Sequence, residues 1–221
     1  MTQEALQVLC APEAVQKRYG LEQGEFPVFQ FAVGDGNHSL ATAKECYERQ
    51  KRFTPPEKWE ELPARYALCE VVNLHDDSLE FEPIHRVIFH IKGRELLNAM
   101  LQVFPGAYEG EGEGHVLRYV WAGGEGAVTV PKPVHQLPVG TLQSFLDDYI
   151  PAHGGSVDYI HGADVAAGLG RGSGNMAFLL EPMSKEELFP TVLHDGVLPR
   201  KTFSMGEAHD KRFYLEARKI R

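Results

Sequence analysis

The feature that most constrains the fold is an apolar run that leads through a glycine turn into a helical pattern, at residues 28–51. Residues 28–33 (Val-Phe-Gln-Phe-Ala-Val) are mostly apolar and follow a proline, which predicts a buried strand that stops at Gly34. After Gly36 the apolar side chains recur at helical spacing, at Leu40, Ala43 and Tyr47. The stretch therefore predicts a strand that turns directly into a helix.

The turn itself is unusually rich in polar side chains, with Asp35, Asn37, His38 and Ser39 within five residues. The start of a helix leaves backbone N–H groups unpaired, and the helix dipole favours negative charge there. We therefore predict a phosphate-binding turn over residues 34–39. A structural interpretation also stands, in which one polar side chain caps the helix and the glycines supply positive φ. The number of polar groups favours a ligand, because a cap needs only one.

Composition excludes some classes of function. The chain has 221 residues and a net charge of -9, which argues against nucleic-acid partners because those require clustered Lys and Arg. The residues are 43% hydrophobic and 24% charged, as in a soluble globular protein. We expect no membrane association and a cytoplasmic location, because the sequence shows no signal peptide and no apolar run of membrane-spanning length. Three cysteines, Cys10, Cys46 and Cys69, are expected to be reduced and mostly buried.

The rest of the chain predicts alternating helices and strands. Helices are expected at residues 12–19, 95–104, 140–149, 163–169 and 184–194. Strands are expected at residues 65–74, 79–90, 115–121, 127–130, 156–161 and 175–180, with extended segments at 198–204 and 212–218. The first two strands are most simply a hairpin, in which Pro83 marks an edge or a bulge. The pattern predicts an α/β (mixed α+β) fold, a mixed sheet with flanking helices, in one compact domain over residues 1–221 or in halves divided near residue 105.

Three ordered segments carry a family resemblance. They are residues 33–44 (Val-Gly-Asp-Gly-Asn-His-Ser-Leu-Ala-Thr-Ala-Lys), 83–87 (Pro-Ile-His-Arg-Val) and 198–204 (Leu-Pro-Arg-Lys-Thr-Phe-Ser). Together they resemble the uncharacterised prokaryotic family catalogued as domain of unknown function number 1015, over nearly the whole chain. Members of that family carry Asp-Gly-His-His-Arg at the turn, a Pro-x-His-Arg strand and a late Pro-Pro-Lys-Ser-Thr segment. The turn also resembles, more distantly, the phosphate-binding box of the ParB/sulfiredoxin superfamily, which includes nucleotide-dependent free serine kinases.

The resemblance implies that Gly36, Asn37, His38 and Ser39 contact nucleotide phosphates. This chain departs from the family pattern at Ser39, where an Arg is expected, so the bidentate phosphate clamp is missing. Family members are also usually longer, with a substantial region before the central strand. We therefore interpret the chain as a fragment or a short form.

Several other basic residues are candidates to replace the missing clamp. Arg86 is predicted to compensate as a phosphate contact, although a salt bridge would explain it equally, and His85 points to the opposite face of the same strand. Lys201 and Arg200 are predicted late-chain donors to the pocket, or else charges that protect an exposed strand edge. Weaker candidates are Lys44, Arg171, Thr202, Ser204, Glu207 and His209.

These residues lead to a hypothesis of Mg²⁺-assisted phosphoryl transfer. Asp35 would hold the metal, and His38 would contact the phosphates or act in acid–base catalysis, with Mg²⁺ and a nucleotide such as ATP or ADP as cofactors. The alternative is a non-catalytic ligand-binding or regulatory module that uses the same turn for a small-molecule ligand. A third possibility is a homodimer whose partner supplies the missing groups. Hydrolase and zinc-enzyme functions are disfavoured because the sequence shows no H-x-x-x-H pair and no Ser or Cys nucleophile signature.

Overall fold

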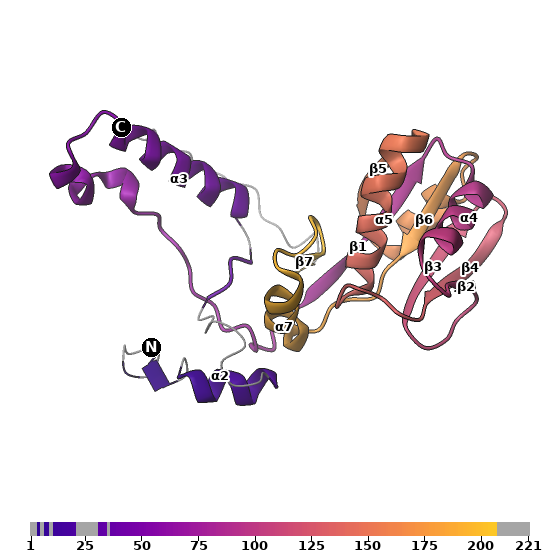
Figure 1. The fold of residues 1–221 in the computed structure, drawn as a ribbon, viewed down its shortest axis with the longest axis horizontal. Helices are drawn as coiled ribbons and strands as arrows, with labels where there is room; N and C mark the ends of the chain where they lie inside the picture. The colour runs from indigo at the N-terminus through magenta and orange to yellow at the C-terminus, as the bar shows by residue number, and fades with distance from the viewer. Residues whose placement is uncertain (1–3, 5–6, 9–10, 21–30, 35, 207–221) are drawn as a thin grey trace. The chain divides into compact units, whose positions relative to one another are not determined.

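The computed structural model describes residues 4, 7–8, 11–20, 31–34 and 36–206. The chain divides into two compact units, Met1–Asp76 and Asp77–Arg221, which are described separately below (Figure 1). The sequence predicted one domain or a division near residue 105. We refer to the two parts as the N-terminal unit and the C-terminal unit.

The elements of the N-terminal unit whose bounds lie in the described residues are all helices. They are α2 (Pro12–Tyr19), α3 (Asn37–Lys51), η1 (Pro56–Glu61) and η2 (Pro63–Arg65). The predicted end of α2 at Gly20 is confirmed, because Gly20 adopts a left-handed φ of 64°. The end of α3 is anchored on η1, where the Lys51 ammonium lies 4.8 Å from the Tyr47 ring and 5.0 Å from the Trp59 ring.

Two strands predicted for this unit are wrong in the described residues. Residues 31–33 form no strand and are exposed, while residues 28–30 lie outside the described part. Residues 65–74 also form no strand, and Leu68 is 102% exposed, so the predicted hairpin with residues 79–90 is absent there. A high β-propensity produces a strand only where a partner pairs with the backbone. Cys46 and Cys69 are likewise exposed rather than buried, and Cys10 lies outside the described residues.

The C-terminal unit is built on a seven-stranded sheet in which every described pairing is antiparallel. This corrects the predicted mixed sheet. The strand order is β2-β4-β3-β6-β1-β5, and β7 pairs with β1. The strands are β1 (Phe81–Phe89), β2 (Tyr108–Glu109), β3 (His115–Trp121), β4 (Gly124–Val130), β5 (Ser156–His161), β6 (Asn175–Leu179) and β7 (Phe203–Met205).

The sheet is organised around β1, which lies between β5 and β6 and also pairs with β7 through residues 81–83. Residues 84–88 are all buried, which indicates that both faces of this strand are covered. Pro83 pairs with Phe203 of β7, whereas the β5 pairing begins at Ile84. Pro83 therefore lies where one edge of β1 has no described partner, in agreement with the predicted edge position.

The helices of the C-terminal unit agree with the predicted positions. They are α4 (Gly93–Val103), α5 (Pro138–His153), α6 (Ala163–Gly170) and α7 (Lys185–Asp195). The capping box that begins α7 is confirmed, because the Ser184 N–H donates to Glu187 Oε2 at 2.7 Å. Helix α6 packs against the centre of the sheet, where Val87, Ala166 and Ala177 form a fully buried cluster. No helix in the described ranges has the length and apolar character needed to cross a membrane.

Candidate functional site

The predicted phosphate-binding turn forms the start of α3, and its described residues are exposed. Gly36 takes a left-handed φ of 78° as the N-cap, as the sequence predicted for a glycine in a tight turn. Among the described residues no side chain caps this helix, and its first turn holds no acidic residue. The first backbone bond into the helix is from the Leu40 N–H to the Gly36 carbonyl, at 2.9 Å. The N–H groups of residues 37–39 therefore have no acceptor within the helix.

The same turn brings together most of the side chains that the sequence singled out. Asn37, His38 and Ser39 are exposed, and the Thr42 hydroxyl donates to the His38 carbonyl at 2.9 Å. Lys44, one to two turns further on, is also exposed. Asp35, the predicted metal ligand, lies outside the described residues. The alternative in which Asn37 or Ser39 caps the helix has no support, since neither makes a capping hydrogen bond.

Arg86, the predicted replacement for the missing clamp, is fully buried in the C-terminal unit. Its guanidinium donates to the carbonyls of Ile84 (2.5 Å), Lys201 (2.7 Å) and Arg200 (2.9 Å), and to Gln143 Oε1 (3.2 Å). These bonds use four of the five N–H groups of an arginine. Burial lowers the pKa of Arg86 to about 10, so the guanidinium still carries its charge at neutral pH.

Two of the three motif segments meet at Arg86. Besides the bonds from Arg86 to the carbonyls of Arg200 and Lys201, β1 pairs with β7, and the Phe81 and Phe203 rings stack 4.1 Å apart. Residues 199–202 thus form a turn rather than the predicted extended segment, and the strand begins at Phe203. The third segment, the start of α3, belongs to the other unit.

The turn has an unusual backbone. Lys201 adopts a positive φ of 57°, which is uncommon for a residue with a side chain. The Thr202 hydroxyl donates to the Pro199 carbonyl at 2.6 Å and closes the turn. The sequence was predicted to be extended here, although Pro199 followed by two long polar residues is a pattern typical of turns and could have predicted this one.

His85 is as buried as its neighbour Arg86, so neither residue of this pair is a surface contact. The Leu180 N–H donates to His85 Nδ1 at 3.1 Å. Burial lowers the pKa of His85, and the Arg86 charge lowers it further. His85 is therefore a neutral, structural histidine with its proton on Nε2.

The remaining candidates are distributed through the C-terminal unit or lie outside the described residues. Arg171 is exposed and pairs with Glu125 at 3.8 Å, while Thr202 and Ser204 are buried. Glu207 and His209 lie outside the described part. Within the described ranges, no three His, Cys, Asp or Glu side chains gather closely enough to hold a metal ion.

The fold and the candidate site describe an α/β protein that has an antiparallel sheet in one unit and an exposed, uncapped helix start in the other. The family model described as protein of unknown function (DUF1015) matches residues 14–149, and the chain belongs to this family. The match includes the start of α3 and Arg86, whereas the turn at 199–202 lies beyond it. No curated protein and no solved structure matches the chain.

Proposed function

We propose that this protein binds a nucleotide or another phosphorylated small molecule at the turn formed by residues 34–39. The observation that supports this most is the start of α3, where three successive N–H groups have no acceptor within the helix, no side-chain cap among the described residues and no acidic residue in the first turn. Such a helix start favours an anion through both its free donors and its dipole. The exposed Asn37, His38 and Ser39 add side-chain donors.

The proposed chemistry is phosphoryl transfer to a small molecule, assisted by Mg²⁺. Mg²⁺ in such sites is commonly held by one or two carboxylates together with the phosphates of the substrate, which gives Asp35 the metal-binding role. His38 would contact the phosphates and stabilise the charge that develops on them. ATP or ADP is the proposed nucleotide. The other residues of the site, Gly34 and Gly36, allow the backbone to approach the phosphates closely.

A second candidate function is a non-catalytic module that senses the same ligand. Two observations favour it. Ser39 occupies the position where the family pattern has an Arg. Arg86 already donates four of its five N–H groups to residues of the C-terminal unit, which leaves one for a ligand. A site with few cations stabilises a transferring phosphoryl group poorly, since that chemistry depends on positioned positive charge.

Calorimetric titration tests the shared claim. ATP, ADP, CTP and GTP, each with Mg²⁺, are titrated into the wild type and into the double variant Asp35→Ala, His38→Ala. The control is His75→Ala, Asp76→Ala, which removes the same two side-chain types from the same unit. We expect binding to the wild type and the control, and loss of binding in the Asp35, His38 variant. Absence of binding to the wild type would refute the proposal.

Turnover separates the two candidate functions. The wild type is incubated with the nucleotide that binds, Mg²⁺ and acceptors such as free serine, and the nucleotide product is measured: the diphosphate where the donor is a triphosphate, and the monophosphate where the donor is ADP. Acceptor-dependent release that the Asp35, His38 variant lacks supports a kinase. Binding without release supports the sensing module.

A further inference from the structure

The C-terminal unit holds a concentration of positive charge that the proposed function does not use. The Arg86 and Arg200 guanidiniums both lie over the Tyr159 ring beside the turn 199–202, which also contains Lys201, and in the described residues a single carboxylate, that of Asp147, pairs with these residues, 3.4 Å from Arg200. The partners of Arg86 itself are three carbonyls and an amide, all neutral. This excess of positive charge stands out in a chain whose net charge is -9.

A buried cation without a paired anion is costly to maintain. Removing a guanidinium from water carries a desolvation penalty, which neutral hydrogen-bond partners offset only in part. Arg86 is nevertheless fully buried, and its Cζ lies 4.9 Å from the centre of the Tyr159 ring. Arg200 lies over the same ring at 5.6 Å. The buried hydroxyl of Tyr159 has no hydrogen-bond partner in the described structure, so the group also contains an unsatisfied polar atom.

The backbone of the turn is held in a strained conformation by this arrangement. Lys201 has a φ of 57°, and the carbonyls of both Lys201 and Arg200 accept hydrogen bonds from Arg86. A residue with a side chain keeps such a conformation only where its surroundings impose it, and strain of this kind clusters at ligand-binding positions. The Lys201 and Arg200 side chains are both exposed, and no described carboxylate pairs with Lys201.

We propose that the turn 199–202 is an anion-binding site of the C-terminal unit, in which Lys201 and Arg200 contact a phosphate or carboxylate group. Arg86 is the positioning residue: it holds the two carbonyls and thereby fixes where the two exposed cations lie. The ligand is a small oxyanion or a molecule that carries one. This proposal uses only residues of the C-terminal unit and none of those at the start of α3, so it does not rest on the proposed function.

The test is a titration followed by amide chemical shifts in two-dimensional ¹H–¹⁵N NMR of the full chain. One arm uses pyrophosphate and the other uses citrate, which distinguishes a phosphate ligand from a carboxylate ligand. We expect one of the two anions to shift the amides of Lys201 and Thr202. Lys201→Ala is expected to weaken that binding about tenfold or more, the effect of losing a hydrogen bond to a charged group. The control Lys132→Ala removes an exposed lysine from the same unit and should change the affinity by less than about twofold.

Lys201→Gly separates a ligand-binding turn from a merely structural one. Glycine adopts positive φ freely, so this variant should melt about 2 °C higher than Lys201→Ala and still bind the anion as weakly. Arg86→Lys should weaken anion binding although Lys201 is unchanged. If that variant fails to fold, the two Lys201 variants still test the proposal. The proposal is overturned if neither anion shifts the Lys201 and Thr202 amides, or if Lys201→Ala and Lys132→Ala lose affinity equally. The shifts should persist in the Asp35→Ala, His38→Ala variant, so failure here and failure at the start of α3 are distinguishable.

Discussion

Replacing Arg86 with methionine should destabilise the C-terminal unit far more than the same change at an exposed arginine. Arg86 is fully buried and donates to three carbonyls, including that of Ile84 in its own strand. Methionine fills much of the volume but offers no donor. The substitution therefore tests how much the hydrogen bonds at this position contribute beyond packing.

The magnitude follows from the groups that lose a partner. Each buried acceptor left without a donor costs about 1–3 kcal/mol. Three carbonyls without a donor would therefore cost at most about 9 kcal/mol in the free energy of unfolding, and two effects reduce this cost. Water reaches the exposed turn at Arg200 and Lys201, and the variant no longer buries a charge. We expect a net loss of about 3 kcal/mol in the free energy of unfolding.

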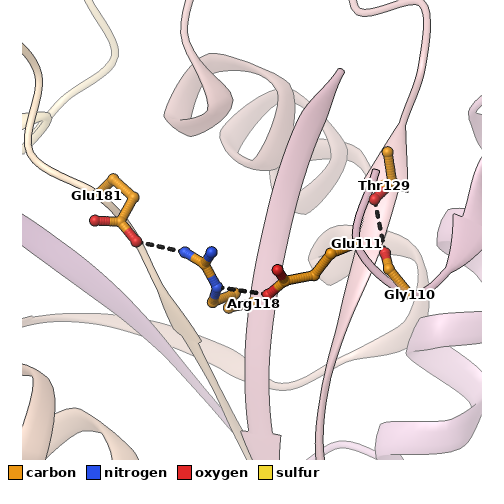
Figure 2. A network of polar contacts seen from close by, with 5 residues as sticks. All are labelled: Gly110, Glu111, Arg118, Thr129 and Glu181. Carbon is orange, nitrogen blue, oxygen red and sulfur yellow. Dashed lines mark hydrogen bonds and ion pairs between the residues drawn. The ribbon is translucent and has the colours of Figure 1, made fainter. Parts of the chain in front are cut away.

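Arg118 provides the matched control. It lies on β3 with its side chain 43% exposed, and its Nε is 2.8 Å from Glu111 Oε1. Figure 2 shows this ion pair and the second one, to Glu181. Exposed ion pairs contribute little because water and salt screen them, so Arg118→Met should cost less than about 1 kcal/mol. Because salt screens these ion pairs, the free-energy cost of Arg118→Met should decrease as the salt concentration rises.

Urea denaturation followed by tryptophan fluorescence measures both variants. The chain has two tryptophans, Trp59 in the N-terminal unit and Trp121 in the C-terminal unit. A Trp59→Phe background therefore leaves Trp121 as the reporter of the unit that holds Arg86. A loss at Arg86 below about 1 kcal/mol, or an equal loss at Arg118, would refute the reasoning, because the three carbonyls would then not depend on this donor.

Two further predictions concern the C-terminal unit. Gly170→Ala should destabilise the C-terminal unit by about 2 kcal/mol, because the new Cβ would lie 2.6 Å from Ala177 Cβ. Gly168→Ala has open space around the new Cβ and should stabilise α6 by about 0.5–1 kcal/mol. The melting temperatures of the two variants test this difference. The pKa of His85 is below its ordinary 6.5 in the folded state, so the unfolded chain binds more protons and stability falls as pH drops below about 6.5. His85→Asn keeps an acceptor for the Leu180 N–H without titrating, and urea midpoints from about pH 7.5 to about pH 5 should fall less steeply for this variant; equal slopes would contradict the assignment.

Local sequence signals predicted much of the C-terminal unit. The capping box at Ser184 acts within a few residues, and β3 coincides with the predicted strand 115–121. Strand β4, however, begins at Gly124, inside the glycine stretch that was predicted to be a connection. The order of strands was not predictable in the same way. Strand β1 pairs with three strands that follow it by about 70 residues or more, and no local pattern encodes those partners.

The incorrect predictions also have physical causes. Residues 65–74 have the composition of a strand but remain exposed, because composition specifies a preference and not the partner that satisfies it. Arg86 was predicted as a phosphate contact that replaces the missing clamp, or else as a member of a salt bridge. Its actual partners are backbone carbonyls of a turn more than 100 residues later, which no spacing in the sequence reveals.

The candidate site itself was partly predictable. The glycine at the helix start and the polar residues after it were predicted together, and the structure places Gly36, Asn37, His38 and Ser39 at the exposed start of α3. The sequence did not reveal that none of the described side chains caps the helix. That property, rather than the residue types, supports the proposal of an anion site.

Amide chemical shifts at the start of α3 test the central claim most directly. The full chain, labelled with ¹⁵N, is titrated with ATP and Mg²⁺, and the amides of Asn37, His38 and Ser39 are followed. Because these N–H groups are proposed to donate to the phosphates, they should show the largest shifts in the N-terminal unit, and the Asp35→Ala, His38→Ala variant should lose them. Unchanged amides at these three positions, at nucleotide concentrations up to several millimolar, would contradict a phosphate site at this turn.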